Sequence, residues 1–265
     1  MPTETMLVFD RAAVRAHRER AAATVGSVAD LLRDGAERLI DRLDDTTGQF
    51  GLALDVGGRG VVAPMLRARG IATVSCDLSA KMARVSGGLA VVADEEFLPF
   101  APASLDLIVA SLSLHWINDL PGALIQFRRA LRPDGLFLAS MPALGSLAEL
   151  RAALTEAELA LRGGVSPRVS PFPDLPDCAG LLQRAGFAAP VVDLEEVVVR
   201  YADPFRLLLD LRAAGETNAI RARSRRGAPA QLFPMALAGM READGRVPAR
   251  IRLATMTGWA SGKLG

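Results

Sequence analysis

The sequence predicts an α/β fold: one domain with a mostly parallel sheet and helices on both faces. Between residues 50 and 141, short apolar runs alternate with amphipathic stretches of helical spacing, and such alternation is typical of parallel sheets. The run Leu105–Ser111 is almost wholly apolar and is expected to be buried on both faces. A glycine-rich segment, Asp55-Val56-Gly57-Gly58-Arg59-Gly60, follows the first apolar run. Segments of this kind bind nucleotide-like cofactors in α/β folds.

The composition fits one well-packed domain and argues against several kinds of partner. The chain has 265 residues, of which 50% are apolar, enough to bury a large core. A net charge of +1 predicts no binding to nucleic acid, and no apolar run is long enough for a membrane span. Two distant cysteines, Cys76 and Cys178, and two histidines predict neither a disulfide framework nor a structural metal. A reduced, cytoplasmic compartment fits these features.

The N-terminal part is expected to be helical. Residues 9–45 indicate one or two helices, because Leu32, Ala36, Leu39 and Leu43 recur at helical spacing. The first of these helices carries four arginines, a feature of mitochondrial presequences, but acids lie among them and presequences avoid acids. We therefore predict a solvated first helix, with a basic patch as the alternative. Its arginines are Arg11, Arg15, Arg18 and Arg20.

The middle of the chain supplies the sheet. The expected strands are 50–56, 71–77, 89–93, 105–111 and 136–141, and the expected helices are 61–69, 79–85 and 119–131. Ser79 is a suitable N-cap for the second of these helices, and Pro121 lies in the first turn of the third, where proline is tolerated. The segment Arg132-Pro133-Asp134-Gly135 is predicted to form the turn that leaves this third helix.

From residue 142 the regular alternation ends. The expected elements are helices at 146–161, 177–185, 204–214 and 228–243 and strands at 191–201 and 251–259, with a structured loop or lid at 163–173. The chain is expected to be a single domain over residues 1–265. Within it we distinguish N-terminal helices (9–45), a cofactor-binding core (50–141), and a cap with the C-terminal strands (142–265).

Three acids follow three successive strands of the predicted sheet. Asp55, Asp77 and Asp94 each close a strand, on the side of the sheet where open α/β folds bind ligands. A carboxylate after the second strand suits a ribose diol, because it accepts two hydrogen bonds from hydroxyls. A carboxylate after the third strand can accept a hydrogen bond from an adenine amino group. Together the three acids predict an adenosine site, although any one of them can also be a turn residue.

Two adenosine cofactors match this pattern. The segment from Gly58 to Ala63 has the G-x-G-x-x-A spacing of dinucleotide-binding loops, with Asp77 near the distance expected for the ribose acid. The acid before the glycines, Asp55, and the acid after the third strand are more natural for S-adenosylmethionine. We therefore expect S-adenosylmethionine and keep a dehydrogenase as a distant alternative.

Several segments carry a family resemblance over nearly the whole chain. The run Ser113-Leu114-His115-Trp116-Ile117-Asn118-Asp119, with Leu131-Arg132-Pro133-Asp134-Gly135 after it, resembles class I S-adenosylmethionine-dependent methyltransferases. It is typical of the branch that holds the biotin-synthesis malonyl-carrier methyltransferase and the mitochondrial complex I assembly factor that hydroxylates an arginine. Further matches, which point to the second of these, are the opening Phe9-Asp10-Arg11 and residues 163–172, 182–187, 215–218, 247–249 and 258–259.

The resemblance implies a fold and a set of cofactor contacts. It implies a Rossmann-like class I methyltransferase fold, with a seven-stranded, mostly parallel sheet, an antiparallel last strand, and a helical cap over the cofactor. Because the family start lies at residue 9, we expect a bacterial member without a transit peptide. The implied cofactor residues are Asp55, Gly57, Gly58 and Gly60 for the aminoacyl end, Asp77 with Leu78 for the ribose, Asp94 with Glu95 for the adenine, and Ser111 near the methyl group. The glycine segment is one residue shorter than the family pattern Asp-x-Gly-x-Gly-x-Gly, which puts cofactor binding in question.

Substrate residues are predicted in the specific segments outside the core. His115 is a candidate general base, or is packed with its imidazole in a structural hydrogen bond. Arg168 is a candidate for binding an anionic group on the substrate, or pairs with a surface acid. Glu216 and Asn218 are candidates for substrate contact, or cap a turn. The remaining candidates are Trp116, Ser166 and Ser170.

Three functions remain open at this point. The first is an enzyme that modifies a complex I subunit, by methylation or by arginine hydroxylation, although no iron site is recognisable in the sequence. The second is a methyltransferase on a small or carrier-bound acid, as in biotin synthesis. The third is a non-catalytic assembly factor that has lost cofactor binding through its shortened glycine segment.

Overall fold

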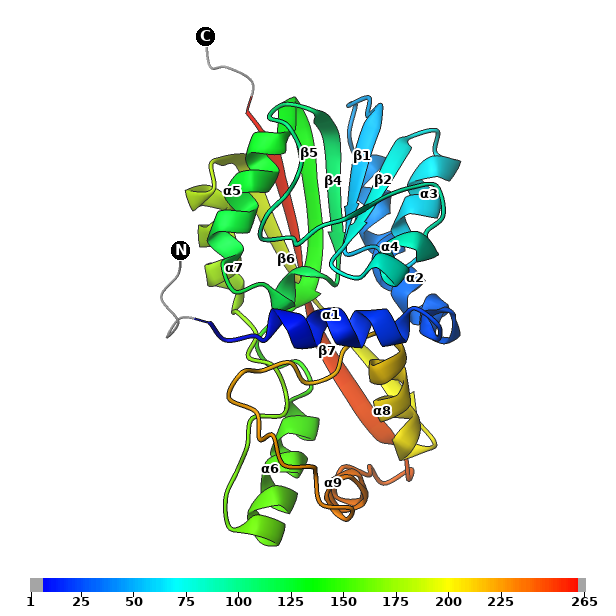
Figure 1. Cartoon of the computed structure of the whole chain (residues 1–265), viewed down its shortest axis with the longest axis vertical. Helices are drawn as coiled ribbons and strands as arrows, with labels where there is room; N and C mark the ends of the chain where they lie inside the picture. Colours follow the sequence, from blue (N-terminus) through cyan, green and yellow to red (C-terminus); the bar gives the residue numbers. More distant parts are fainter. Residues whose placement is uncertain (1–6, 262–265) are drawn as a thin grey trace.

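The computed structural model describes residues 7–261, which form one seven-stranded sheet with helices on both faces (Figure 1). The strand order is β3-β2-β1-β4-β5-β7-β6. The first five strands are parallel, and β7 runs antiparallel to both β5 and β6, which confirms the predicted sheet. The strands are β1 Leu52–Val56, β2 Ala72–Asp77, β3 Leu89–Val92, β4 Leu105–Ser111, β5 Leu131–Pro142, β6 Phe187–Tyr201 and β7 Val247–Ala260.

The helices begin and end close to the predicted positions. They are α1 Arg11–Ala21, α2 Ala29–Ile40, α3 Val62–Ala68, α4 Ala80–Val85, α5 Leu120–Ala130, α6 Ala148–Arg162, α7 Leu175–Arg184, α8 Pro204–Ala213 and α9 Leu232–Gly239, with short 3-10 turns η2 Val25–Val28, η3 Asp41–Leu43 and η4 Leu114–Trp116. Ser79 caps α4 as predicted: its hydroxyl accepts the Met82 N–H at 3.1 Å. Asp119 caps α5 in the same way, through the Gly122 N–H at 2.9 Å.

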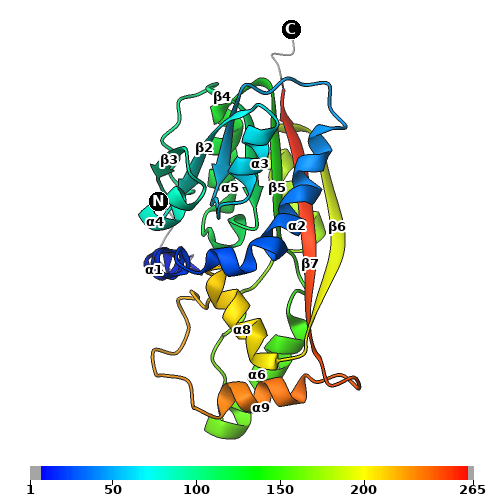
Figure 2. The ribbon, with the colours of Figure 1, turned by 90° about the vertical axis from the view of Figure 1, so that its right-hand side faces the viewer.

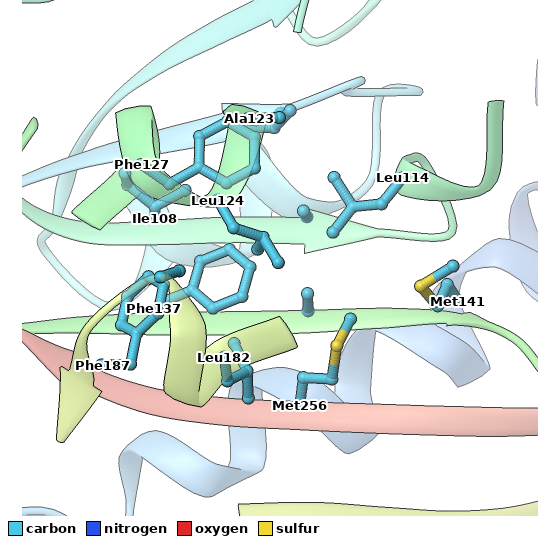
Figure 3. Packing of buried hydrophobic residues seen from close by; sticks show 14 of the residues in the cluster. Ile108, Leu114, Ala123, Leu124, Phe127, Phe137, Met141, Leu182, Phe187 and Met256 are labelled. Atoms are coloured by element: carbon cyan, nitrogen blue, oxygen red, sulfur yellow. The ribbon is translucent and has the colours of Figure 1, made fainter. Parts of the chain in front are cut away.

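The sheet is buried on both faces because alternate residues of its central strands point to opposite sides. On one face, Ile108 of β4 packs against α5 and α7, where Phe137 stacks between Phe127 and Phe187 at ring distances of 5.7 and 5.1 Å (Figure 3). On the other face, Leu107 and Val109 of the same strand pack with residues of α2 and α3. This confirms the prediction that β4 is buried on both faces.

A cap made of α6, α8 and α9 lies beyond the end of the parallel strands, and α1 crosses between the cap and the sheet (Figure 1; Figure 2 gives the view from the side). The cap has its own apolar core, in which Leu154, Leu207 and Leu237 meet Val247 and Ala249 at the start of β7. The long strands β6 and β7 therefore extend from the sheet into the cap. The chain ends of the predicted domain, 1–6 and 262–265, lie outside the described residues.

Two predicted elements differ in the structure. The turn predicted at Arg132–Gly135 lies within the bounds of β5 and is a bulge, not a free turn. Leu131 pairs with Leu105 and the next pair joins Leu136 to Leu107, so the four residues between them leave the ladder, with Asp134 at a left-handed φ of 63°. The helix predicted at 228–243 is also too long, and α9 ends at Gly239.

Candidate functional site

The glycine segment lies at the carboxyl end of β1, pressed between β2, α4 and the chain after β4. The Gly57 N–H donates to the Cys76 carbonyl at 2.7 Å, and Gly57 has φ +68°. A Cβ on Gly57 would overlap Ser113. Gly60, at φ +83°, donates its N–H to Ser86 Oγ at 3.2 Å, and a Cβ there would lie 2.8 Å from Val85. The segment therefore requires glycine at both positions.

Asp55, in β1, contacts the glycine segment and the start of α3. Its Oδ2 accepts the Ala63 N–H at 3.2 Å, and a Cβ on Gly58 would overlap its carboxylate. Burial raises the pKa of Asp55 to about 7, and the Ala63 N–H opposes that shift only in part. Asp55 thus holds the start of α3 and the glycine segment together.

The acids after β2 and β3 are engaged by α1. Asp77 is fully buried, and its Oδ2 accepts Arg18 Nη1 at 2.5 Å. Asp94 accepts Arg11 at 2.5 Å, and Arg11 also pairs with Glu95. Glu95 in turn lies 3.5 Å from Arg18 Nη1.

The prediction of a solvated first helix is therefore wrong for two of its four arginines. Arg18 is only 1% exposed and Arg11 is mostly buried, whereas Arg15 and Arg20 face solvent. Arg11, Val14 and Arg18 are spaced by three and four residues, so they share one face of α1. A buried arginine is stable there because the acids of the sheet edge supply its partners.

Glu216 joins the cap to the core at this edge. Its Oε1 pairs with Arg59 of the glycine segment at 2.7 Å, and its Oε2 accepts His115 Nε2 and Trp116 Nε1, each at 2.7 Å. Burial alone would raise the pKa of Glu216, but His115, Arg59 and Arg18 outweigh it, so this pKa lies well below its ordinary value. His115 Nε2 makes the structural hydrogen bond of the packed interpretation, and His115 Nδ1 has no partner among the described residues.

Several buried polar atoms around the glycine segment have no partner among the described residues. They are Arg18 Nη2, Arg59 Nε, Ser113 Oγ and His115 Nδ1. Buried polar groups are normally paired, and two of these atoms belong to cationic donors, so the missing partner is an acceptor.

These residues fit S-adenosylmethionine in their chemistry. The cofactor carries a carboxylate on its aminoacyl end, which matches the unpaired Nε of Arg59 in the glycine segment. Its ribose diol and adenine amine match Asp77 and Asp94. Both acids are paired with α1 arginines in this conformation. These residues fit the cofactor once the pairs of Arg18 with Asp77 and of Arg11 with Asp94 have opened.

The predicted substrate residues fall into two groups. Trp116 and Glu216 lie together at the sheet edge, whereas three other candidates hold loops of the cap to one another. Arg168 pairs with Glu158 at 2.6 Å. Its alternative interpretation predicted pairing with an acid, but this acid is buried and not on the surface. Ser166 Oγ accepts the Ser224 N–H at 2.8 Å, and Asn218 donates to the Pro167 carbonyl at 2.9 Å.

The other candidates lie at the margins of the site. Ser170 is buried, and its carbonyl accepts Arg151. Phe172, two residues further on, brings this loop to His115 at a ring distance of 6.1 Å. Leu78 packs with Phe9 and Trp116. Ser111 is half-buried at the end of β4.

Sequence reasoning missed Arg11, Arg18 and Arg59 as site residues. The spacing of Arg11 and Arg18 around Val14 was available as a signal for a buried face. The position of Arg59, only 6% exposed and against Glu216, depends on a contact between segments 157 residues apart and has no local signal.

The described residues offer neither a metal-binding cluster nor a membrane-spanning helix. Within residues 7–261, no cluster of three or more His, Cys, Asp or Glu side chains is placed to hold a metal ion. None of the helices in that part of the chain is long and apolar enough to cross a bilayer.

Comparison with known proteins supports a methyltransferase relationship along the whole chain. A methyltransferase domain model matches residues 54–139. The human mitochondrial arginine-hydroxylase NDUFAF5 is 39% identical over 96% of this chain and 77% of its own. The malonyl-[acyl-carrier protein] O-methyltransferase of Laribacter hongkongensis is 36% identical over 94% of this chain and 89% of its own.

A solved structure shows the same fold at much lower identity. It is phosphoethanolamine N-methyltransferase 2 of Haemonchus contortus in complex with S-adenosyl-L-methionine, at a TM-score of 0.57 and 16% identity over 94% of this chain and 60% of that chain. Together with the relatives at higher identity, the comparison fixes the family. The chain belongs to the class I S-adenosylmethionine-dependent methyltransferase superfamily and is related to both the NDUFAF5 arginine hydroxylases and the malonyl-carrier O-methyltransferases.

Proposed function

We propose that this protein is an S-adenosylmethionine-dependent enzyme that modifies a protein subunit during assembly of respiratory complex I. The observation that carries the proposal is the pairing of Arg59 with Glu216, which joins the glycine segment to the Gly215-Glu216-Thr217-Asn218 segment. That second segment is one of those that resemble the complex I branch. Relatives of that branch match almost the whole chain.

The chain's own residues have defined tasks in this proposal. Gly57, Gly58 and Gly60 let the backbone approach the aminoacyl end of the cofactor, and Arg59 supplies a donor beside them. Asp77 and Asp94 take the ribose and the adenine. When bound, the cofactor supplies a methyl group activated for transfer. The protein's main contribution is to hold donor and acceptor in line and to exclude water.

Glu216 positions the other side of the site. By accepting hydrogen bonds from both His115 and Trp116, it fixes the ring orientation of two side chains that follow β4. The nitrogen of His115 that does not bond to Glu216, Nδ1, is buried and has no hydrogen-bond partner among the described residues. His115 can therefore take a proton from an acceptor group that must lose one.

A genetic experiment tests this function. Deletion of the gene in its host should lower the amount of assembled complex I, and the wild-type chain should restore it. A chain with Asp77→Ala and Asp94→Ala should not restore it, while the exposed Asp193→Ala should. Restoration by the double variant would contradict an enzymatic role and support a non-catalytic assembly factor. Mass analysis of the complex I subunits would then separate methylation from arginine hydroxylation, because the two add different masses.

A second candidate is O-methylation of a malonyl carrier protein, favoured by the 36% identity to the Laribacter hongkongensis enzyme. It predicts rescue of a biotin auxotroph that lacks this methyltransferase. Rescue together with unchanged complex I levels in the deletion strain would replace the first function by the second.

A further inference from the structure

Helix α1 crosses the carboxyl end of the sheet (Figure 1). Arg11 and Arg18 lie seven residues apart on this helix. Arg18 Nη1 lies 2.5 Å from Asp77, and Arg11 Nη2 lies 2.5 Å from Asp94. The two guanidinium groups thus reach the acids that follow β2 and β3. These are the acids whose positions match the ribose and the adenine of an adenosine ligand.

We propose that α1 is an internal competitor of the cofactor: Arg11 and Arg18 occupy the adenosine acids, and the helix must withdraw before an adenosine ligand can bind. The inference rests on the proposed function and adds to it a closed state of the same site. The contacts of Arg18 with Asp77 and of Arg11 with Asp94 form this arginine latch.

The contacts at Asp77 show why the latch and the ribose exclude each other. Asp77 Oδ1 accepts the Ser79 N–H at 2.7 Å, and Oδ2 accepts Arg18 at 2.5 Å. Asp77 has no exposed surface, and Arg18 is 1% exposed. Each carboxylate oxygen can accept a second hydrogen bond, so the exclusion comes from burial and not from the number of acceptors. Because Asp77 has no exposed surface while Arg18 is in place, Arg18 must move before the sugar hydroxyls can reach the carboxylate.

The latch is built so that it can open. Arg18 Nη2 is buried without a partner among the described residues, and an unpaired buried donor costs free energy in the closed state. Arg11 keeps some exposure, with 16% of its side chain open to solvent. The closed state therefore leaves one buried donor unsatisfied, which lowers the free-energy cost of opening it.

The helix is also tied to the loop that carries Glu216. The Asp10 N–H donates to the Ala219 carbonyl at 2.8 Å, and Phe9 forms a backbone bridge with Ile220. His17 Nδ1 lies 3.1 Å from the Thr217 carbonyl, and a Cβ on Gly215 would lie 3.5 Å from the Arg18 side chain. Withdrawal of α1 consequently loosens the segment that places Glu216, so that cofactor binding and the state of the cap are coupled.

Calorimetric titration of four proteins with two probes tests the latch. The proteins are the wild type, Arg11→Gln, Arg18→Met and the matched control Arg15→Gln, whose arginine is exposed on the same helix. The probes are S-adenosylhomocysteine and adenosine, which lacks the aminoacyl part. We expect both latch variants to bind both probes at least about fivefold more tightly than the wild type, because the closed state is less populated. Arg15→Gln should bind like the wild type.

Tryptophan emission gives a second readout that needs no activity. Arg11 donates to the Trp116 carbonyl at 3.1 Å, and the Phe9 ring lies 5.3 Å from the Trp116 ring. In a Trp259→Phe background, Trp116 is the sole tryptophan of the chain. We expect the emission of the free Arg11→Gln protein to shift toward that of the ligand-bound wild type.

The outcomes separate the latch from the function. Wild-type binding of S-adenosylhomocysteine with unchanged or weaker binding in both latch variants would overturn the latch and leave the function standing. Weaker binding of S-adenosylhomocysteine with unchanged binding of adenosine would make the arginines ligands of the aminoacyl carboxylate and also overturn the latch. No binding of either probe by any of the four proteins would overturn the cofactor and the latch together. If Arg18→Met does not fold, Arg11→Gln alone decides, because Arg11 is less buried.

Discussion

At the scale of single residues, Glu216 is the side chain on which most of the site depends. Its carboxylate accepts hydrogen bonds from three different donors: a guanidinium, an imidazole and an indole. Only 16% of its side chain is exposed, so the donors are largely shielded from water. A buried ion pair adds little to the free energy of unfolding compared with apolar groups of the same size. Removing the Glu216 charge alone is costly, however, because it leaves Arg59 buried and unpaired.

Glu216→Gln tests this dependence. The amide keeps the shape but loses the charge and turns one acceptor into a donor that faces other donors. We expect the free energy of unfolding to fall by about 3 kcal/mol, measured by urea denaturation. The matched control is Glu242→Gln, which breaks the exposed pairs with Arg200 and Arg250. That control should cost much less than Glu216→Gln, because solvent screens its ion pairs, and equal losses in the two variants would contradict the burial argument.

Asp55 predicts a specific dependence of stability on pH. Burial raises its pKa from 3.8 to about 7. Between these values the folded protein holds a proton that the unfolded chain has released, so the contribution of this group to stability falls as the pH rises through that window. Asp55→Asn removes the titration while keeping an acceptor for Ala63. The variant should gain on the wild type by up to roughly 4 kcal/mol between about pH 4 and pH 7. Parallel pH profiles for the two proteins would show that Asp55 is ionised in the fold.

At the scale of elements, the glycine segment and α1 decide whether the site is open. The segment folds into a turn despite being one residue short of the family pattern, and Gly57 keeps a hydrogen bond to β2. The crowded side of this turn is formed by Ser113 and by Arg18 of α1. The turn and the helix are therefore packed as one unit.

Comparing alanine substitutions at two glycines with positive φ distinguishes the stability cost of steric crowding from that of backbone strain. Gly57 and Gly70 have φ values of +68° and +80°, but a Cβ on Gly70 meets open space. We expect Gly70→Ala to cost about 1 kcal/mol through its left-handed backbone alone. Gly57→Ala should cost about 2 kcal/mol more, because the methyl group overlaps Ser113. Thermal and urea unfolding of both variants provide the check, and equal costs would mean that the turn has room to relax.

The sequence was a good guide to the elements and a poorer guide to the contacts between them. The spacing of apolar residues and the capping residues predicted the strands and most helices, because these elements depend mainly on residues close together in the sequence. The segment Arg132–Gly135 was predicted as a free turn and is a bulge inside β5, because Leu131 and Leu136 on either side of it both pair with β4. The acids at the strand ends were placed correctly at the sheet edge. The arginines that engage them were not foreseen, since Arg18 and Asp77 are 59 residues apart.

At the scale of the whole molecule, the fold is a methyltransferase core with a cap, and the two share a single buried cluster of charges. The core contributes Asp77, Glu95 and Arg59, α1 contributes Arg18, and the cap contributes Glu216. Members of the cluster come from segments spread from α1 to the loop after α8. Cofactor binding, the position of α1 and the position of the cap are therefore expected to change together.

Calorimetric titration of the purified protein with S-adenosylhomocysteine, with Asp77→Ala and the exposed Asp193→Ala titrated in parallel, tests cofactor binding directly. We expect micromolar binding, about −8 kcal/mol, to the wild type and to Asp193→Ala, and none to Asp77→Ala. Binding that survives Asp77→Ala would place the ribose elsewhere. Absence of heat at millimolar ligand, in wild-type protein shown to be folded, would contradict the central claim that this chain binds S-adenosylmethionine.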